Sequence, residues 1–186
     1  SMPVERYSNR RRIHFIITGG TIDDIDLSKA GPVSEVELAR NPHLYTLIPA
    51  MLENGGVTDF TWEAPFIKDS RVLTDEGDRT ELLGLIRDSP SKRVVVTHGT
   101  YTLNKTFDFL LAHRREFKGK TVVLTGAFRP PSEANSDAQF ALGMANATAL
   151  THKPGLYIAL GGSVVAADSA TRQRFNKFFS TVKSRF

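Results

Sequence analysis

The chain contains no cysteine among its 186 residues. That absence excludes disulfide bonds, thiolate metal sites and a cysteine nucleophile, and it argues against a redox role. Hydrophobic residues make up 40% of the chain and charged residues 24%. These proportions are typical of globular proteins, and the chain is long enough to bury one substantial core. We therefore expect one globular domain, and we predict neither a metal nor a cofactor.

Long apolar runs are also missing. No stretch approaches the roughly 20 residues that span a bilayer, and the N-terminus lacks the basic, apolar and small-residue order of a secretory signal. These absences predict a soluble cytoplasmic protein with no membrane partner. The opening Ser-Met resembles the scar of a protease cleavage, so these two residues are left out of the fold prediction.

Positive charge is concentrated at the two ends of the chain. The formal net charge is +4; Arg6 and the three arginines at residues 10–12 lie near the start, and Lys177, Lys183 and Arg185 lie near the end. A basic arm can bind nucleic acid, but this one has no interleaved aromatics and no recognition motif. We interpret residues 1–12 as a tag remnant and solvated basic arm, and residues 13–186 as the folded domain. Nucleic-acid binding is kept only as a minor hypothesis.

Short β-branched runs alternate with longer stretches of helical period, which is the pattern of repeated βαβ units. Strands are expected at residues 14–18, 57–62, 93–97, 120–125 and 156–160, and helices at 43–54, 75–88, 102–117, 136–150 and 168–180. No internal repeat or linker divides the chain. We predict a single α/β domain with three layers and a doubly wound, mostly parallel sheet of the flavodoxin or Rossmann kind.

Three predicted strands end in loops of unusual composition. They are Thr-Gly-Gly-Thr-Ile-Asp-Asp at residues 18–24, Thr-His-Gly-Thr-Tyr-Thr at 97–102 and Thr-Gly-Ala-Phe-Arg-Pro at 125–130. Ligands of open α/β sheets bind outside the carboxyl ends of the strands, so these loops are candidates for a site. The first loop lacks the lysine of a phosphate loop and the third glycine of a dinucleotide fingerprint, which argues against a nucleotide.

Two threonines on these loops suggest acyl transfer. Thr21 and Thr100 could bring hydroxyls to neighbouring strand ends, where one attacks an amide carbon and backbone N–H groups hold the oxyanion. The attacking hydroxyl needs a partner that accepts its proton. The alternatives are a plain tight turn at the first loop, and a helix cap by Thr100 or Thr102 at the second. His98 is either catalytic or a satisfied structural histidine, and its place at a strand end favours the structural role.

The motifs together resemble a known family. Thr-Gly-Gly-Thr-Ile, Lys-Asp-Ser-Arg, Thr-His-Gly-Thr-Tyr-Thr and Leu-Thr-Gly-Ala-Phe-Arg-Pro follow one another in the order and spacing of the L-asparaginase (asparaginase/glutaminase) family, over residues 13–172. Typical members carry a second, C-terminal domain that completes a neighbouring subunit's site. The chain therefore resembles a short member that matches the N-terminal domain, and the resemblance implies a homodimer or higher homo-oligomer.

The resemblance also implies roles for single residues. Thr21 matches the primary nucleophile, and Thr100 matches the second catalytic threonine. The implied reaction hydrolyses the side-chain amide of L-asparagine, or of a related small amide, to the acid and ammonia.

The expected binding residues come from three segments. Asp69 and Ser70 match the loop that holds the α-carboxylate and amino group of the substrate. Gly99 and Ala127 match positions that line the pocket through their backbones, with Ala127 near the side-chain amide. The resemblance thus implies a pocket for a small amide or amino acid.

Some positions depart from the family pattern. Tyr101 stands where members have an aspartate that grips the substrate ammonium, and Arg172 stands where they have a catalytic lysine. Arginine keeps the positive charge but is effectively never deprotonated, so it does not replace lysine as a proton acceptor. The mobile tyrosine that follows the family nucleophile is not evident here, and Asp23, Asp24 or Asp26 could supply a compensating carboxylate. The alternative function is therefore a catalytically impaired protein that binds a small amino-acid ligand without efficient turnover.

Overall fold

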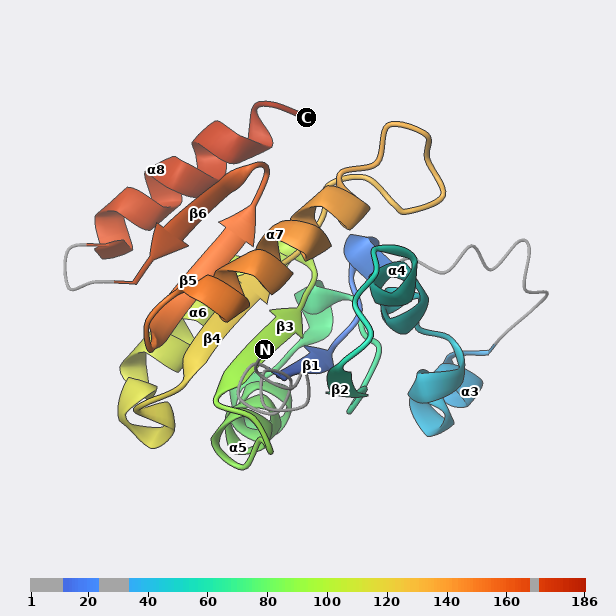
Figure 1. Cartoon of the computed structure of the whole chain (residues 1–186), viewed down its shortest axis with the longest axis horizontal. Helices are drawn as coiled ribbons and strands as arrows, with labels where there is room; N and C mark the ends of the chain where they lie inside the picture. Colours follow the sequence, from blue (N-terminus) through green and yellow to red (C-terminus); the bar gives the residue numbers. More distant parts are fainter. Residues whose placement is uncertain (1–11, 24–33, 168–170) are drawn as a thin grey trace, which may run out of the picture.

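The computed structural model describes residues 12–23, 34–167 and 171–186. Within these residues the chain forms one sheet in the strand order β2-β1-β3-β4-β5-β6 (Figure 1). Neighbouring strands are parallel from β2 to β5, whereas β6 runs antiparallel to β5. The strands are β1 Ile13–Ile17, β2 Phe60–Glu63, β3 Arg93–Thr97, β4 Thr121–Thr125, β5 Gly155–Leu160 and β6 Ser163–Ala166.

The order of the strands places a switch point between β1 and β3. The chain leaves β1, forms β2 on one side of it, and then returns to form β3 on the other side. Ile17 is paired with Thr97, and Thr97 is paired with Thr125, so β1, β3 and β4 end at the same level. Loops that follow β1 and β3 therefore leave the same edge of the sheet in opposite directions, which is where open α/β folds bind ligands.

Helices cover both faces of the sheet. Helices α4 (Ile48–Asn54) and α7 (Ala138–Thr151) enclose one core with one face, and α5 (Thr80–Arg87), α6 (Leu103–Ala112) and α8 (Thr171–Lys183) enclose a second core with the other. Figure 1 shows α7 crossing the near face over β4 and β5. The short helix α3 (Glu35–Arg40) precedes α4. These layers confirm the predicted doubly wound α/β fold.

Residue types explain why the central strands sit between two layers. Strands β1 and β4 are buried at every position, and β3 is buried from its second residue onward. Their isoleucine, valine and leucine side chains can pack on both faces of a parallel strand. Helix α7 buries Ala138, Ala141 and Ala145 against the sheet. These small side chains let the helix approach the strands closely.

Most predicted elements are present, with informative differences. The predicted helix 75–88 begins as a π-helix, Asp75–Arg79, before it continues as α5. The predicted helix 102–117 ends at Ala112, and a separate 3-10 helix, Arg114–Phe117, follows. Strand β6 was not predicted. It forms because Gly161 and Gly162 both have positive φ, 57° and 78°, as the two central residues of a tight hairpin require.

The ends of the chain bear on two further predictions. Within the predicted basic arm only Arg12 is described, and its Nε donates to Asp59 Oδ1 over 2.8 Å. Residues 1–11 lie outside the described part of the chain. None of the described helices is both long enough and apolar enough to cross a membrane.

The end of β3 yields a test of stability. Thr97 is fully buried, and its Oγ1 has no hydrogen-bond partner among the described residues. A buried hydroxyl without a partner costs about 1 kcal/mol or more. We expect Thr97→Val to raise the free energy of unfolding by about 1 kcal/mol in urea titrations.

The matched control is the neighbouring position on β4. Thr125 is equally buried, but its hydroxyl donates to Ala141 O over 3.4 Å. Thr125→Val should therefore lower the free energy of unfolding, by about 0.5 kcal/mol. A loss of stability in both variants would show that the Thr97 hydroxyl is satisfied after all.

Candidate active site

The loops after β1 and β3 touch through glycine backbones. Gly20 has a φ of 86°, and a Cβ added there would lie 2.4 Å from both the Cα and the N of Gly99. No real side chain fits at such a distance, so a glycine is needed at position 20 for the two loops to approach. The loop after β4 joins the same contact, since a Cβ on Gly126 would lie 2.6 Å from His98 O and 3.3 Å from Thr100 Cγ2. The three loops singled out in the sequence therefore converge.

A fourth segment completes the cluster. Lys68 N donates to Thr18 O over 3.0 Å, and a Cβ on Gly19 would lie 2.7 Å from Lys68 N. A Cβ on Gly99 would lie 2.8 Å from Ser70 Oγ. The Lys-Asp-Ser-Arg segment is thereby held against the β1 and β3 loops.

Thr21 and Thr100 directly follow the two glycines in contact. Both side chains are partly exposed, and neither hydroxyl makes a hydrogen bond with a described residue. Thr100 begins a 3-10 helix, Thr100–Thr102, whose N-cap is Gly99, and Thr102 makes no side-chain cap on α6. The capping alternative is therefore wrong for both threonines. A hydroxyl that is accessible and unpaired can interact with a ligand.

Ser70 is buried and fixes the β3 loop from below. Its Oγ accepts a hydrogen bond from Thr102 N over 3.2 Å, and its carbonyl accepts one from the Thr102 hydroxyl over 2.7 Å. Gly99 and Ala127 are buried as well. Neither residue has a polar side chain, so each has only backbone groups with which to form a hydrogen bond to a ligand.

Asp69 and Tyr101 meet at an arginine that the sequence analysis did not assign. Arg71 Nη2 donates to Asp69 Oδ2 over 2.6 Å, and the Arg71 guanidinium lies over the Tyr101 ring at 4.7 Å from its centroid. These hydrogen bonds from Arg71 lower the pKa of Asp69. The Tyr101 side chain is 66% exposed. The Asp69 carboxylate is thus already occupied by a cation, and the sequence signal was the arginine of the Lys-Asp-Ser-Arg motif itself.

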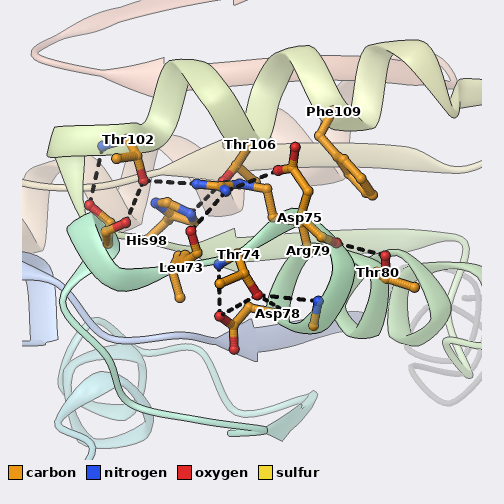
Figure 2. A network of polar contacts seen from close by, with 12 residues as sticks. Leu73, Thr74, Asp75, Asp78, Arg79, Thr80, His98, Thr102, Thr106 and Phe109 are labelled. Atoms are coloured by element: carbon orange, nitrogen blue, oxygen red, sulfur yellow. Dashed lines mark hydrogen bonds and ion pairs between the residues drawn. The ribbon is translucent and has the colours of Figure 1, made fainter.

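A buried arginine, Arg79, connects the segment before α5 to the first part of α6 (Figure 2). Arg79 is 3% exposed, and its Nε donates to Thr106 Oγ1 over 2.8 Å while its Nη2 donates to Thr102 Oγ1 over 3.0 Å. Its Nη1 donates to Leu73 O and to Asp75 Oδ1. The guanidinium therefore ties the π-helix, the loop before it and α6 into one unit beneath the site.

His98 is the last member of this network. Its Nδ1 lies 2.7 Å from Gly99 O, and because a carbonyl can only accept, Nδ1 carries the proton. Nε2 then accepts a hydrogen bond from the Thr106 hydroxyl, also over 2.7 Å. Burial lowers the pKa of His98 to about 4, against the hydrogen bond to Gly99, and the charge of Arg79 lowers it as well. Both ring nitrogens are engaged, so His98 has the structural role that the sequence favoured.

A second ion pair anchors the start of the Lys-Asp-Ser-Arg segment. Lys68 Nζ donates to Asp78 Oδ1 over 2.8 Å, and Thr74 N donates to Asp78 Oδ2 over 2.9 Å. Burial opposes ionisation, but these hydrogen bonds outweigh it and lower the pKa of Asp78. Lys68 and Asp78 thus neutralise each other beside the site.

The compensating groups considered from the sequence are only partly described. Asp23 is buried, and its Oδ1 accepts a hydrogen bond from Leu47 N over 2.6 Å, so it connects the β1 loop to the start of α4. Asp24 and Asp26 lie outside the described residues. Arg172 is the second residue of α8, which begins at Thr171, and its side chain is not among those described.

Comparison with known proteins identifies the family of this chain. Residues 12–184 match the family model "Asparaginase, N-terminal". The chain belongs to the asparaginase family and corresponds to the N-terminal domain of that family.

Individual relatives agree with this assignment. The chain is 28% identical over 175 residues to a glutaminase-asparaginase of Acinetobacter glutaminasificans, covering 88% of this chain and 50% of the relative. It resembles the crystal structure of a probable cytoplasmic L-asparaginase from Campylobacter jejuni, with a TM-score of 0.59, 26% identity, and coverage of 84% of this chain and 44% of that one.

The thermostable L-asparaginase of Thermococcus kodakarensis gives a TM-score of 0.63 and 25% identity, over 80% of this chain and 43% of that one. This chain therefore spans about half the length of the relatives it matches.

The glycine contact yields a second test. We expect Gly20→Ala to lower the free energy of unfolding by about 3 kcal/mol, because the methyl group meets the Gly99 backbone in addition to the strain of positive φ. Gly56 is the matched control, since its φ is 84° and a Cβ there would meet nothing within 4 Å. Gly56→Ala should cost only about 1 kcal/mol. Equal losses in urea titrations would contradict the proposed close approach.

Buried His98 yields a prediction about pH. The unfolded chain takes up a proton on this histidine near pH 6.5, whereas the folded chain does so only near pH 4. The unfolded state therefore binds more protons between these values, and stability present above pH 6.5 is lost as the pH falls toward 4. The expected loss is about 3 kcal/mol.

The measurement is the free energy of unfolding from urea titrations at pH 7, 5.5 and 4.5. His98→Gln should be less stable than the wild type at pH 7 but should lose much less stability across this range. Asp78, with a pKa lowered from 3.8, affects stability only at lower pH. Parallel pH profiles for the variant and the wild type would contradict the account of His98.

Proposed function

We propose that this chain hydrolyses the side-chain amide of L-asparagine, or of a related small amide, with Thr21 as the nucleophile. The observation that carries the proposal concerns the hydroxyls of Thr21 and Thr100 beside the Gly20–Gly99 contact. Both are accessible, and neither makes a hydrogen bond with a described residue. Membership of the asparaginase family and the names of its relatives support this substrate class. The predicted homo-oligomer and cytoplasmic location remain predictions.

The proposed chemistry proceeds in two steps. The Thr21 oxygen forms a bond to the amide carbon, and as the C–N bond breaks the nitrogen leaves as ammonia with the hydroxyl proton. Water then attacks the resulting ester, which releases the acid and restores the hydroxyl. Thr100, on the loop after β3, would receive or relay the proton. His98 is excluded from that role because both of its nitrogens are engaged.

The remaining pocket residues would position the substrate. Ser70, Gly99 and Ala127 are buried around the converging loops, and the latter two offer backbone groups. Asp69 and Tyr101 would contact the polar end of the substrate together with Arg71, and Arg172 would supply the positive charge that the family places on lysine. No described side chain near the hydroxyls offers a free carboxylate to a substrate ammonium, since Arg71 already holds Asp69.

A second candidate function follows from the same residues. Tyr101 is exposed and stacked against Arg71, and His98 is locked, so the described site holds no evident base. Weak activation of Thr21 would leave a protein that binds a small amino acid without efficient turnover. The choice between the two functions therefore depends on proton transfer and not on the pocket.

Ammonia release from L-asparagine tests the proposal. Thr21→Ala should reduce the rate at least 100-fold, because the nucleophile is lost, while leaving the urea midpoint unchanged. Thr58→Ala, which removes an exposed hydroxyl that makes no hydrogen bond with a described residue, is the matched control and should retain wild-type activity.

Calorimetry with L-aspartate completes the experiment. Binding without ammonia release from a panel of amides would favour the second function. Release that is equal in Thr21→Ala would remove Thr21 as the nucleophile, and absence of both binding and release would defeat both functions.

A further inference from the structure

A cavity lies at the opposite end of the sheet from the candidate active site. It has a volume of about 580 Å³ and opens between the segment that joins α6 to β4 and the start of β5. Ala167, just after β6, borders it as well. Cavities of this size are typical of small-ligand sites. None of the residues assigned to the proposed active site lines it.

The floor of this cavity is apolar. Phe117 and Leu156 are both 4% exposed and belong to the core that packs under α6, and Leu111 and Pro154 extend the same surface to the opening. A ligand with a hydrocarbon or aromatic body would remove this surface from water. Such burial is favourable at about 25 cal/mol per Å².

The rim of the cavity is basic. Arg114, Arg115 and Lys118 line it, and none of their side chains forms a hydrogen bond or ion pair with a described residue. Lys120 also lines it, with its Nζ donating to Ser89 O over 3.1 Å. Partial burial lowers the pKa of Lys120, against the pull of Asp88. No acidic residue occurs among the described residues that line the cavity.

The neighbouring carboxylates Asp88 and Glu116 are both bound to Arg87, so they offset only part of the charge of the four rim cations. Arg87 Nε donates to Asp88 Oδ1 over 3.0 Å, and Arg87 Nη1 donates to Glu116 Oε1 over 3.2 Å. Arg87 lies on α5 and is not among the residues that line the cavity. Within the described part of the chain, Arg114, Arg115 and Lys118 therefore border the apolar floor without an ion-pair partner.

We propose that this cavity binds a small organic anion with an apolar body, of the class of aromatic carboxylates, sulfonates and phosphate esters. The floor recognises the body and the basic rim recognises the charge. An inorganic anion gains only exposed ion pairs, which are weak, and a neutral aromatic gains only the floor. The combination of the two surfaces selects ligands that have both parts.

The test is a titration of the ¹⁵N-labelled chain followed by NMR, with three probes. Naphthalene-2-sulfonate carries body and charge, 2-naphthalenemethanol carries the body alone, and sodium sulfate at matched ionic strength carries the charge alone. We expect saturable shifts at residues 117–120 and 155–156 with the sulfonate, and at least about tenfold weaker binding of the other two probes.

Charge reversal at the rim locates the site. The double variant Arg115→Glu and Lys118→Glu should bind the sulfonate at least about tenfold more weakly than the wild type does. The control is Lys177→Glu with Lys183→Glu, which changes the net charge equally at exposed positions of α8 and should bind as the wild type does.

Several results would overturn the proposal. They are equal binding of the neutral probe, equal binding of sulfate, shifts confined to other residues, and equal losses in the two double variants. If the rim variant fails to unfold cooperatively in urea, the comparison of the three probes on the wild-type chain decides. Ammonia release plays no part in this test, so its outcome is independent of the proposed active site.

Discussion

The contact between the backbones of Gly20 and Gly99 is the constraint on which the candidate site depends. A side chain at Gly20 would lie 2.4 Å from the backbone of Gly99, so the loops after β1 and β3 can meet only because Gly20 lacks one. Parallel pairing of β1 with β3 brings their ends to one level, and the switch in strand order sends the loops in opposite directions. Thr21 and Thr100 follow the glycines, so their placement is a consequence of this contact.

Local signals in the sequence predicted much of this arrangement. The central strand Arg93–Thr97 was predicted with its observed bounds, because a run of valines is typical of a parallel strand that is buried on both faces. Gly-Gly and His-Gly at the strand ends indicated tight loops, and both threonines lie there. The fold class followed from the alternation of short β-branched runs with helical periods.

The rest depended on contacts between residues far apart in the chain. Arg79 reaches Thr102 and Thr106 across 23 and 27 positions, and nothing in the helical pattern of residues 75–88 distinguishes a buried arginine from a solvated one. The π-helical turn at Asp75–Arg79 changes which side of the helix each later residue faces, and the composition of this segment does not indicate such a turn. Likewise, the stacking of Arg71 on Tyr101 could not be predicted from two motifs that were considered separately.

The pairing of charges differs between the two ends of the sheet. Beside the candidate active site, Lys68 is paired with Asp78, Arg71 with Asp69 and Arg79 with Asp75. These pairs hold the loops in place, and what they leave for a ligand is mainly hydroxyls and backbone groups.

Binding and turnover therefore have separate requirements at this end. The proposed binding of a substrate rests on the converging loops, whereas activation of Thr21 needs a proton acceptor, and neutral His98 is already committed to Gly99 and Thr106. At the other end, Arg114, Arg115 and Lys118 make no ion pair with a described residue and border an apolar floor. At the carboxyl ends of the strands, paired charges thus hold the loops in position for a substrate. At the amino ends of the strands, basic side chains are suited to binding an anion.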